Sequence, residues 1–219
     1  QKRERGKLYF YAMDGKILGQ QEVSIAASQR IDFSGHQFGA NNVGHVAWVP
    51  NTPTARFQLR NIRYLYDNAN GGNSFDTAFQ VEGMHPSGES LVVPLQLEEN
   101  SAILEVVNVS EQVMPVVVSL YDELGVLQVE KNLQLVAKSS THLIVNDLLP
   151  GLKNAVAVVK GNKRNSIVAV GMQYARVDDG AIKYMYGLQA KQATGNVLKN
   201  SYNTYLQQTS QLVLTNSTD

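Results

Sequence analysis

The chain has 219 residues, of which 43% are hydrophobic and 17% charged, and this composition favours a folded, β-rich or extracellular protein over a disordered or Lys/Glu-rich helical one. The 19 basic and 19 acidic residues cancel, so the chain has no net field to attract nucleic acid or an anionic membrane surface. Cysteine is absent, which excludes disulfides, thiolate metal sites and a cysteine nucleophile.

Two further features of the sequence bear on its cellular setting. The apolar runs fall short of the ~20 residues that span a bilayer, so we expect no membrane insertion. The chain starts at Gln1 rather than Met, and we expect a processed or excised segment.

Alternation of apolar and polar residues, interrupted by Gly, Asn, Asp and Ser, predicts β-strands along much of the chain. The predicted strands span residues 102–109, 113–122, 126–136, 141–146, 154–159, 165–175 and 181–188. Short strands separated by turns in this way are typical of an immunoglobulin-like or fibronectin-like sandwich. One helical turn fits in "NDLLPGL", where Pro150 would end it.

The sequence also contains an internal repeat. Gly15 in "YFYAMDGKILGQQEVSI" and Gly125 in "SLYDELGVLQVEKNLQL" are each preceded at four residues by a tyrosine, and similar apolar positions follow both. The same offset of 110 aligns "ARFQLRNIRYLYD" with the strand predicted at 165–175. At an offset of 108, "SAILEVVNVSE" aligns with "TSQLVLTNSTD". This second alignment matches Leu104 with Leu212, Val106 with Leu214, and Asn108 with Asn216.

The repeat predicts an all-β fold of two tandem immunoglobulin-like β-sandwich repeats. One repeat is contiguous and covers residues 83–195, whereas the other is split between residues 1–82 and 196–219. The first strand of the split repeat comes from the C-terminus of the same or a neighbouring chain. We expect Tyr205, Leu212 and Leu214 to be its inward-facing side chains, because a sandwich lacking a strand exposes unpaired backbone groups.

Three arrangements of the split repeat remain open. In a closed form, the C-terminal strand completes the sandwich of its own chain. In a linked form, it enters a neighbouring molecule by strand exchange and builds a head-to-tail fibre. In the third, the chain is a window of a longer repeat array.

The second repeat contains a characteristic run, "LEVVNVSEQVMPVVVSLYDELGVLQVEKNLQLVAKSSTHLIVNDLLPG", in which an Asn-Ser turn leads to a Tyr-Asp-x-x-Gly hairpin and a "DLLPG" corner. This run resembles the tandem β-sandwich repeats of bacterial secreted and cell-surface proteins. The first repeat departs from it, with "DFSGHQFG" at the corner. The resemblance implies an extracellular scaffold, adhesion or fibre role and supplies no catalytic residues.

The densest group of oxygen ligands lies in "DNANGGNSFD", where Asp67, Asn70 and Asp76 are candidate calcium ligands. Ala69 and Gly71 break the EF-hand pattern, and Asn-Gly turns supply the positive φ of a hairpin. We therefore favour a hairpin turn and predict no metal and no cofactor.

The sequence carries no marker of catalysis. The histidines lack the short spacing of a zinc site, and they are His36, His45, His85 and His142. No G-x-S-x-G motif at a strand-to-helix junction marks a nucleophilic hydrolase. We therefore predict that the chain is not an enzyme.

Aromatic side chains are the candidates for ligand binding. Trp48, the single tryptophan, ends the stretch "GHVAW", and Tyr64 and Tyr66 form a Y-x-Y pair that places both rings on one face of a strand. Exposed rings of this kind stack on sugars, whereas buried ones form packing ladders within the sandwich.

The sequence thus predicts a non-enzymatic structural or adhesive module, extracellular or on a bacterial cell surface, with self-association by strand exchange. Its partners would be further copies, a surface glycan or a cell-surface protein, and not nucleic acid. The alternatives are a carbohydrate-binding module and an accessory domain of a secreted hydrolase.

Overall fold

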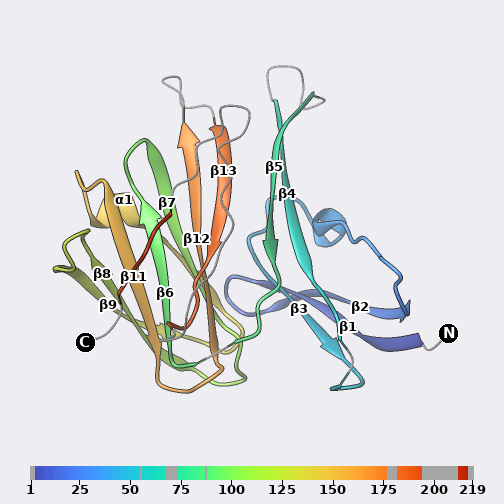
Figure 1. Ribbon diagram of the computed structural model, residues 1–219. Coiled ribbons are helices and arrows are strands. Elements are labelled where there is room, and N and C mark those ends of the chain that lie inside the picture. Colours follow the sequence, from blue (N-terminus) through green and yellow to red (C-terminus); the bar gives the residue numbers. More distant parts are fainter. Residues whose placement is uncertain are drawn as a thin grey trace.

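The computed structural model describes residues 3–54, 56–67, 74–86, 88–176, 182–193 and 212–216, without the side chains of residues 67 and 176 (Figure 1). Within these ranges the strands form four antiparallel sheets, and the helical elements are two single short turns. This architecture confirms the predicted all-β, sandwich-type fold.

A contiguous sandwich follows residue 88 and contains two four-stranded sheets. The first sheet has the order β6-β11-β8-β9 and consists of β6 (Ser90–Gln96), β11 (Asn154–Gly161), β8 (Met114–Tyr121) and β9 (Leu127–Leu135). The second has the order β10-β7-β12-β13 and consists of β10 (Ser140–Ile144), β7 (Asn100–Asn108), β12 (Ile167–Arg176) and β13 (Ile182–Gln189).

The predicted strands of this region all appear, shifted by a few residues at most. The short helix α1 (Val145–Leu148) begins the predicted helical turn and ends two residues before Pro150. Strand β6 was not among the predicted strands. It contains Pro94, and the strand tolerates this proline because β6 lies at the edge of its sheet and pairs only with β11 among the described strands.

The core of the contiguous sandwich lies between its two sheets. Side chains from alternate positions of β6, β7, β8, β11 and β12 are almost fully buried there, which follows from the two-residue period of a strand. Leu104 and Val106 of β7 are at the centre, with no exposed surface. This core accounts for most of the buried hydrophobic residues of the described chain.

The N-terminal unit has fewer strands. One sheet has the order β2-β1-β3 and consists of β1 (Arg3–Ala12), β2 (Ile17–Ala26) and β3 (Gly44–Pro50). A hairpin of β4 (Arg60–Asp67) and β5 (Ser74–Glu82) forms a separate two-stranded sheet. The 3-10 turn η1 (Gly35–Phe38) lies between β2 and β3, where the side chain of Ser34 accepts a hydrogen bond from the backbone N–H of His36.

The strand registers of the two units match closely. The bulge between Phe10 and Tyr11 lies 110 residues before the bulge between Leu120 and Tyr121. The bulge that follows Leu65 in the β4–β5 hairpin lies 110 residues before the one that follows the equivalent residue of β12. The order β2-β1-β3 therefore corresponds to β9-β8-β11, and β4-β5 corresponds to β12-β13.

Candidate functional site

An open groove of about 2120 Å³ lies beside the sheet of the N-terminal unit. Its walls come from the inner face of that sheet, from the segment that leads into β4, and from the outer face of β7. Representative lining residues are Leu8, Val23, Trp48, Phe57, Leu59 and Glu105. The counterpart of this space in the contiguous sandwich is filled by the core, so the groove is the main structural difference between the units.

One strand edge borders the groove. In the contiguous sandwich, β7 pairs with β12 and inserts Leu104 and Val106 into the core. Strand β4, the counterpart of β12, pairs with β5 on one edge, and no described strand pairs with its other edge. We call this second edge the free edge of β4. Backbone N–H and C=O groups along a strand edge of this kind can accept a further strand.

Trp48 lines the groove from β3. Its ring lies edge-to-face with Phe57, with 5.1 Å between the ring centroids. A Cβ atom on Gly6 would approach Cη2 of Trp48 to 2.6 Å, so glycine at position 6 is what lets the indole lie across β1. Trp48 is half-buried, and its Nε1 is buried without a hydrogen-bond partner. Its predicted role in ligand binding stays a prediction.

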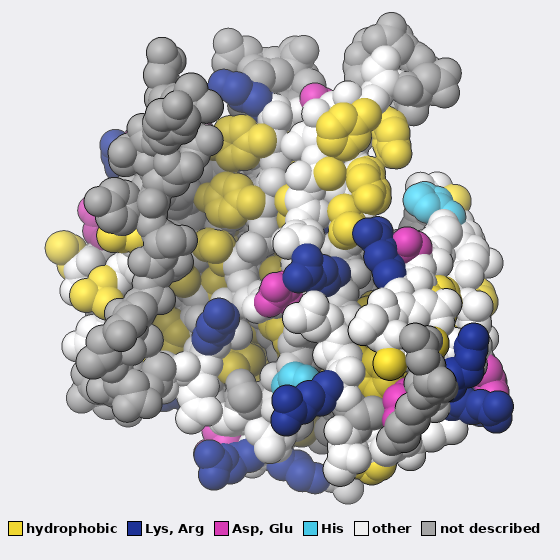
Figure 2. Space-filling view, turned by 45° about the vertical axis from the view of Figure 1, so that its right-hand side comes forward, with side chains coloured by type: hydrophobic (Ala, Val, Ile, Leu, Met, Phe, Trp, Pro, Cys, Tyr) yellow, Lys and Arg dark blue, Asp and Glu magenta, His cyan; other side chains and the backbone are white. Residues whose placement is uncertain are grey.

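Tyr64 and Tyr66 lie on the face of the β4–β5 hairpin opposite the side that contacts the contiguous sandwich. Together with Phe75 they form an exposed aromatic patch, with exposed fractions of 55%, 47% and 61% respectively. The ring centroids are 6.5 Å apart for the two tyrosines and 6.4 Å apart for Tyr66 and Phe75. Figure 2 shows hydrophobic side chains gathered near the upper end of this hairpin.

The other face of the hairpin packs on the outer face of the β10-β7-β12-β13 sheet, as the closeness of β5 and β13 in Figure 1 indicates. Val81 and Phe79 contact Met172 and Val170 in a second, smaller hydrophobic cluster. Gly187 permits this approach, because a Cβ atom there would lie 2.8 Å from Cγ2 of Val81. The hairpin is thus attached to the contiguous sandwich through apolar contacts.

An ion pair reinforces this attachment. Both terminal nitrogens of Arg63 donate hydrogen bonds to the carboxylate oxygens of Glu105, each at 3.1 Å. Burial by itself would lower the pKa of Arg63, but the hydrogen bonds and negative charge of Glu105 outweigh burial and raise that pKa. The guanidinium also lies 5.8 Å from the ring centroid of Phe79. A two-point pair of this kind sets orientation as well as distance.

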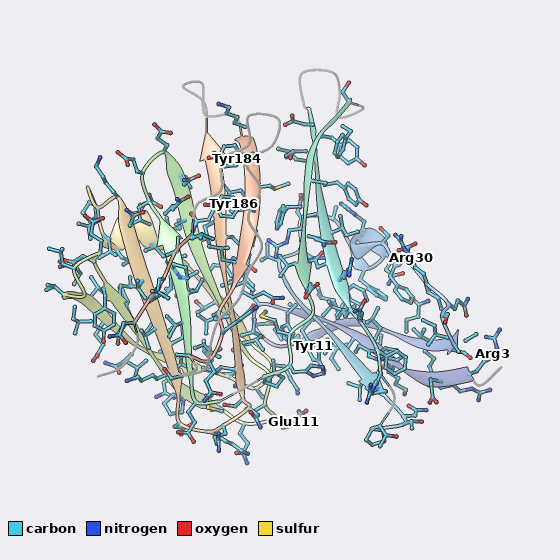
Figure 3. All side chains as sticks on the ribbon, viewed as in Figure 1. Arg3, Tyr11, Arg30, Glu111, Tyr184 and Tyr186 are labelled. Carbon is cyan, nitrogen blue, oxygen red and sulfur yellow. The ribbon has the colours of Figure 1, made fainter. Side chains whose placement is uncertain are left out.

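The β1–β2 turn forms a second contact between the units. The backbone N–H of Ser140 donates a hydrogen bond to the carbonyl of Met13 at 2.9 Å. Tyr11 stacks on His45 with 4.7 Å between ring centroids, and Figure 3 shows Tyr11 near Glu111, where the units meet. Burial, and secondarily the charge of Lys138, lowers the pKa of His45 to about 4. This environment therefore favours the neutral imidazole.

Asn108 ends β7 and ties the two sheets of the contiguous sandwich together. Its Nδ2 lies 3.0 and 2.9 Å from the carbonyl oxygens of Leu135 and Val136, to which it donates. Its Oδ1 accepts hydrogen bonds from the N–H and the hydroxyl of Ser110. The side chain has no exposed surface, so these hydrogen bonds replace the water that it loses.

The candidate metal ligands are not brought together in the part of the chain that can be described. Asp76 is an exposed residue of β5, Asn70 lies outside the described residues, and the side chain of Asp67 is not described. Among the described residues, no group of three His, Cys, Asp or Glu side chains could hold a metal ion.

The candidate residues for strand complementation lie near the C-terminus. Leu212 and Leu214 are 72% and 87% exposed, in a segment, residues 212–216, that forms no strand here. Tyr205 lies outside the described residues. The insertion of this segment into an N-terminal unit stays a prediction.

Sequence reasoning did not find the attachment of the β4–β5 hairpin to the outer face of the contiguous sandwich. The sequence feature that could have revealed this attachment is the apolar character of both faces of β12. In the stretch "IVAVGMQYA", outward-facing Val170 and Met172 alternate with inward-facing Ile167 and Ala169. A strand that is apolar on both faces is typically covered on both.

The fold and the groove define this chain as an all-β protein with one complete sandwich and one sandwich-like unit, in which no described strand pairs with one edge of β4. No protein-family model and no curated protein matches it. Two solved structures are similar at 13% sequence identity. A Thermotoga maritima protein designated 1070 has a TM-score of 0.40 over 50% of this chain and 98% of its own. The Anabaena sensory rhodopsin transducer has a TM-score of 0.33 over 41% of this chain and 99% of its own.

Neither helical turn of the described chain has the length and apolar character that crossing a bilayer requires.

Proposed function

We propose that this chain is a non-enzymatic structural or adhesive module of a bacterial surface or extracellular assembly, which associates with further copies through its N-terminal unit. The observation that carries this proposal is the open groove beside the free edge of β4. A strand edge of this kind favours pairing with another strand. The low charged fraction and the strand-rich repeats support an extracellular setting.

The energetics favour occupation of the groove. Burial of a leucine side chain contributes about 1.5–3 kcal/mol before ordering costs, and Leu212 and Leu214 are both largely exposed. Two such side chains therefore supply a substantial part of the ~5–15 kcal/mol that stabilises a typical domain.

The test is the size of the purified chain as a function of concentration. Light scattering should show particles that grow as the concentration rises, and deletion of residues 201–219 should abolish that growth. A matched control replaces the exposed Leu124, in the β8–β9 turn, by Ser and should assemble like the natural chain. A natural chain that stays monomeric at every concentration would refute the proposal.

The aromatic patch of Tyr64, Tyr66 and Phe75 favours a second candidate function, which is carbohydrate binding. Aromatic rings exposed on one face of a sheet stack well against sugars. Titration calorimetry with soluble polysaccharides should detect binding that Tyr64→Ala abolishes. Tyr184→Ala is the matched control, because Tyr184 is an exposed tyrosine of another Y-x-Y pair. Binding that Trp48→Ala alone abolishes would instead place the ligand in the groove.

A further inference from the structure

The geometry points to one occupant of the groove: residues 212–216 of a second copy of this chain, added as an antiparallel strand to the free edge of β4. In this register Leu212 lies opposite Asn61, and Leu214 lies opposite Leu59. The inference rests on the proposed function and specifies the contact through which the copies associate.

The register follows from the correspondence between the units. In the contiguous sandwich, Leu104 of β7 lies opposite Gly171 of β12, and Val106 lies opposite Ala169. The β12 positions correspond to Asn61 and Leu59 at the offset of 110 that the matching bulges establish. The β7 positions correspond to Leu212 and Leu214 at the sequence offset of 108. The proposed pair of Leu212 and Asn61 is therefore the counterpart of Leu104 and Gly171. The proposed pair of Leu214 and Leu59 is the counterpart of Val106 and Ala169.

The chemistry of the donor segment fits the groove. Leu212 and Leu214 are two positions apart, so both would point to one face of an extended strand. Their counterparts Leu104 and Val106 are completely buried. The groove is lined by half-buried apolar side chains, including Phe57, Leu59 and Ile103.

Asn216 provides a second, polar match. Its counterpart Asn108 donates to the carbonyl oxygens of Leu135 and Val136 at the end of β9. The corresponding positions at the end of β2 are Ile25 and Ala26, which both line the groove. In the proposed strand addition Asn216 would thus stand opposite the two carbonyls that correspond to those that Asn108 binds.

The position of the donor segment favours a second copy as its source. Lys191, just after β13, exchanges two backbone hydrogen bonds with Val92 and so ties the exit of β13 to the edge of β6. Residues 212–216, dark red in Figure 1, lie on the side of the contiguous sandwich, whereas β1 and β2 lie on the opposite side of the molecule. Each copy thus presents a donor segment at one end and an acceptor groove at the other, which is the arrangement of a head-to-tail assembly.

Disulfide trapping tests the register. Asn61→Cys and Leu212→Cys are placed on separate polypeptides, which are mixed and oxidised. Because the natural chain has no cysteine, every disulfide reports the engineered thiols. We expect a disulfide between the two different chains, identified by mass spectrometry of the linked peptides. Leu59→Cys with Leu214→Cys repeats the test at the second pair, in case one variant fails to fold.

The matched control is an Arg60→Cys acceptor mixed with the same Leu212→Cys donor. Position 60 is exposed like Asn61, but a shift of one residue turns the side chain to the opposite face of the strand, so its yield should be at least about tenfold lower. Yields equal to this control at both pairs would overturn the register. A disulfide formed within single chains of the Asn61→Cys/Leu212→Cys double variant at low concentration would overturn the second copy as the source.

Light scattering of the natural chain, run in parallel, distinguishes a failure of this strand addition from a failure of the proposed function. Particles that grow with concentration but give no disulfide above the control would refute this strand addition and leave the proposed function standing. A natural chain that stays monomeric would refute the proposed function itself.

Discussion

The described strands of the N-terminal unit follow part of the strand plan of the contiguous sandwich, and the two units differ in what covers the inner faces of their sheets. In the contiguous sandwich, β6 and β7 complete the two sheets, and the side chains between them form a closed core. In the described part of the N-terminal unit, no strand occupies the position equivalent to β7, and the inner face borders an open groove. The described part of the N-terminal unit thus lacks counterparts of β6, β7 and β10, and the missing β7 position is the one that borders the groove.

The same comparison explains the position of the β4–β5 hairpin. In the contiguous sandwich, the corresponding β12–β13 pair packs through its inner face on the β6-β11-β8-β9 sheet. The β4–β5 hairpin instead places Phe79 and Val81 on the outer face of the neighbouring unit. Both strand pairs bury apolar side chains. The β12–β13 pair buries them inside its own sandwich, whereas the β4–β5 hairpin buries them between the two units. The N-terminal unit thus depends on its neighbour for stability.

The largest expected effect on stability concerns Leu104 and Leu212, which occupy equivalent positions in the two repeats. Leu104→Ala should lower the free energy of unfolding by about 2–5 kcal/mol, because it leaves a cavity in a closed core. Leu212→Ala should change it by less than about 0.5 kcal/mol in the monomer, since that side chain is 72% exposed. Urea denaturation followed by circular dichroism at low protein concentration measures both. Equal losses for the two variants would contradict the assignment of different environments.

An intermediate effect is expected from the ion pair between the units. Glu105→Gln removes the charge that faces Arg63 but keeps the shape of the side chain. We expect a loss of about 2 kcal/mol, below the range for fully buried pairs because Arg63 is partly exposed. Thermal unfolding measures the loss, and Glu98→Gln is the control, because Glu98 forms an exposed pair with Lys153. An equal shift for both variants would show that the Arg63–Glu105 pair does not hold the hairpin.

The smallest expected effect is a pH dependence at the second contact between the units. The pKa of His45 is lowered in the folded chain to about 4 from an ordinary value of 6.5, so the unfolded chain binds its proton first. The stability linked to His45 is therefore fully present above pH 6.5 and is lost as the pH falls toward 4. Because the ring keeps partial exposure to solvent, we expect this loss to be about 1 kcal/mol.

His45→Gln should remove this part of the acid sensitivity in urea denaturation at pH 7 and pH 4.5. His142→Gln, on strand β10, is the control and should keep the pH dependence of the natural chain. A His45→Gln variant that remains as acid-sensitive as the natural chain would contradict the role of the neutral imidazole.

Much of the local structure could be predicted, because strand alternation and turn chemistry are local properties. The residues around Gly125, whose φ is +81°, form a hairpin turn in which Asp122 accepts backbone hydrogen bonds from Leu124 and Val126. The edge strand β6 was missed because Pro94 interrupts the usual strand pattern. The Trp48–Phe57 contact and the Arg63–Glu105 pair could not be predicted, because each joins residues from separate segments of the chain.

The amino-acid sequence by itself determined most strands of the contiguous sandwich, their turns and the internal repeat, because alternation and glycine positions act over a few residues and need no partner. Only the tertiary structure decided where the β4–β5 hairpin packs and which strand edge borders a groove. Those outcomes depend on which apolar faces meet. Val81 and Met172 lie 91 positions apart in the chain, and no local pattern specifies that they share a cluster.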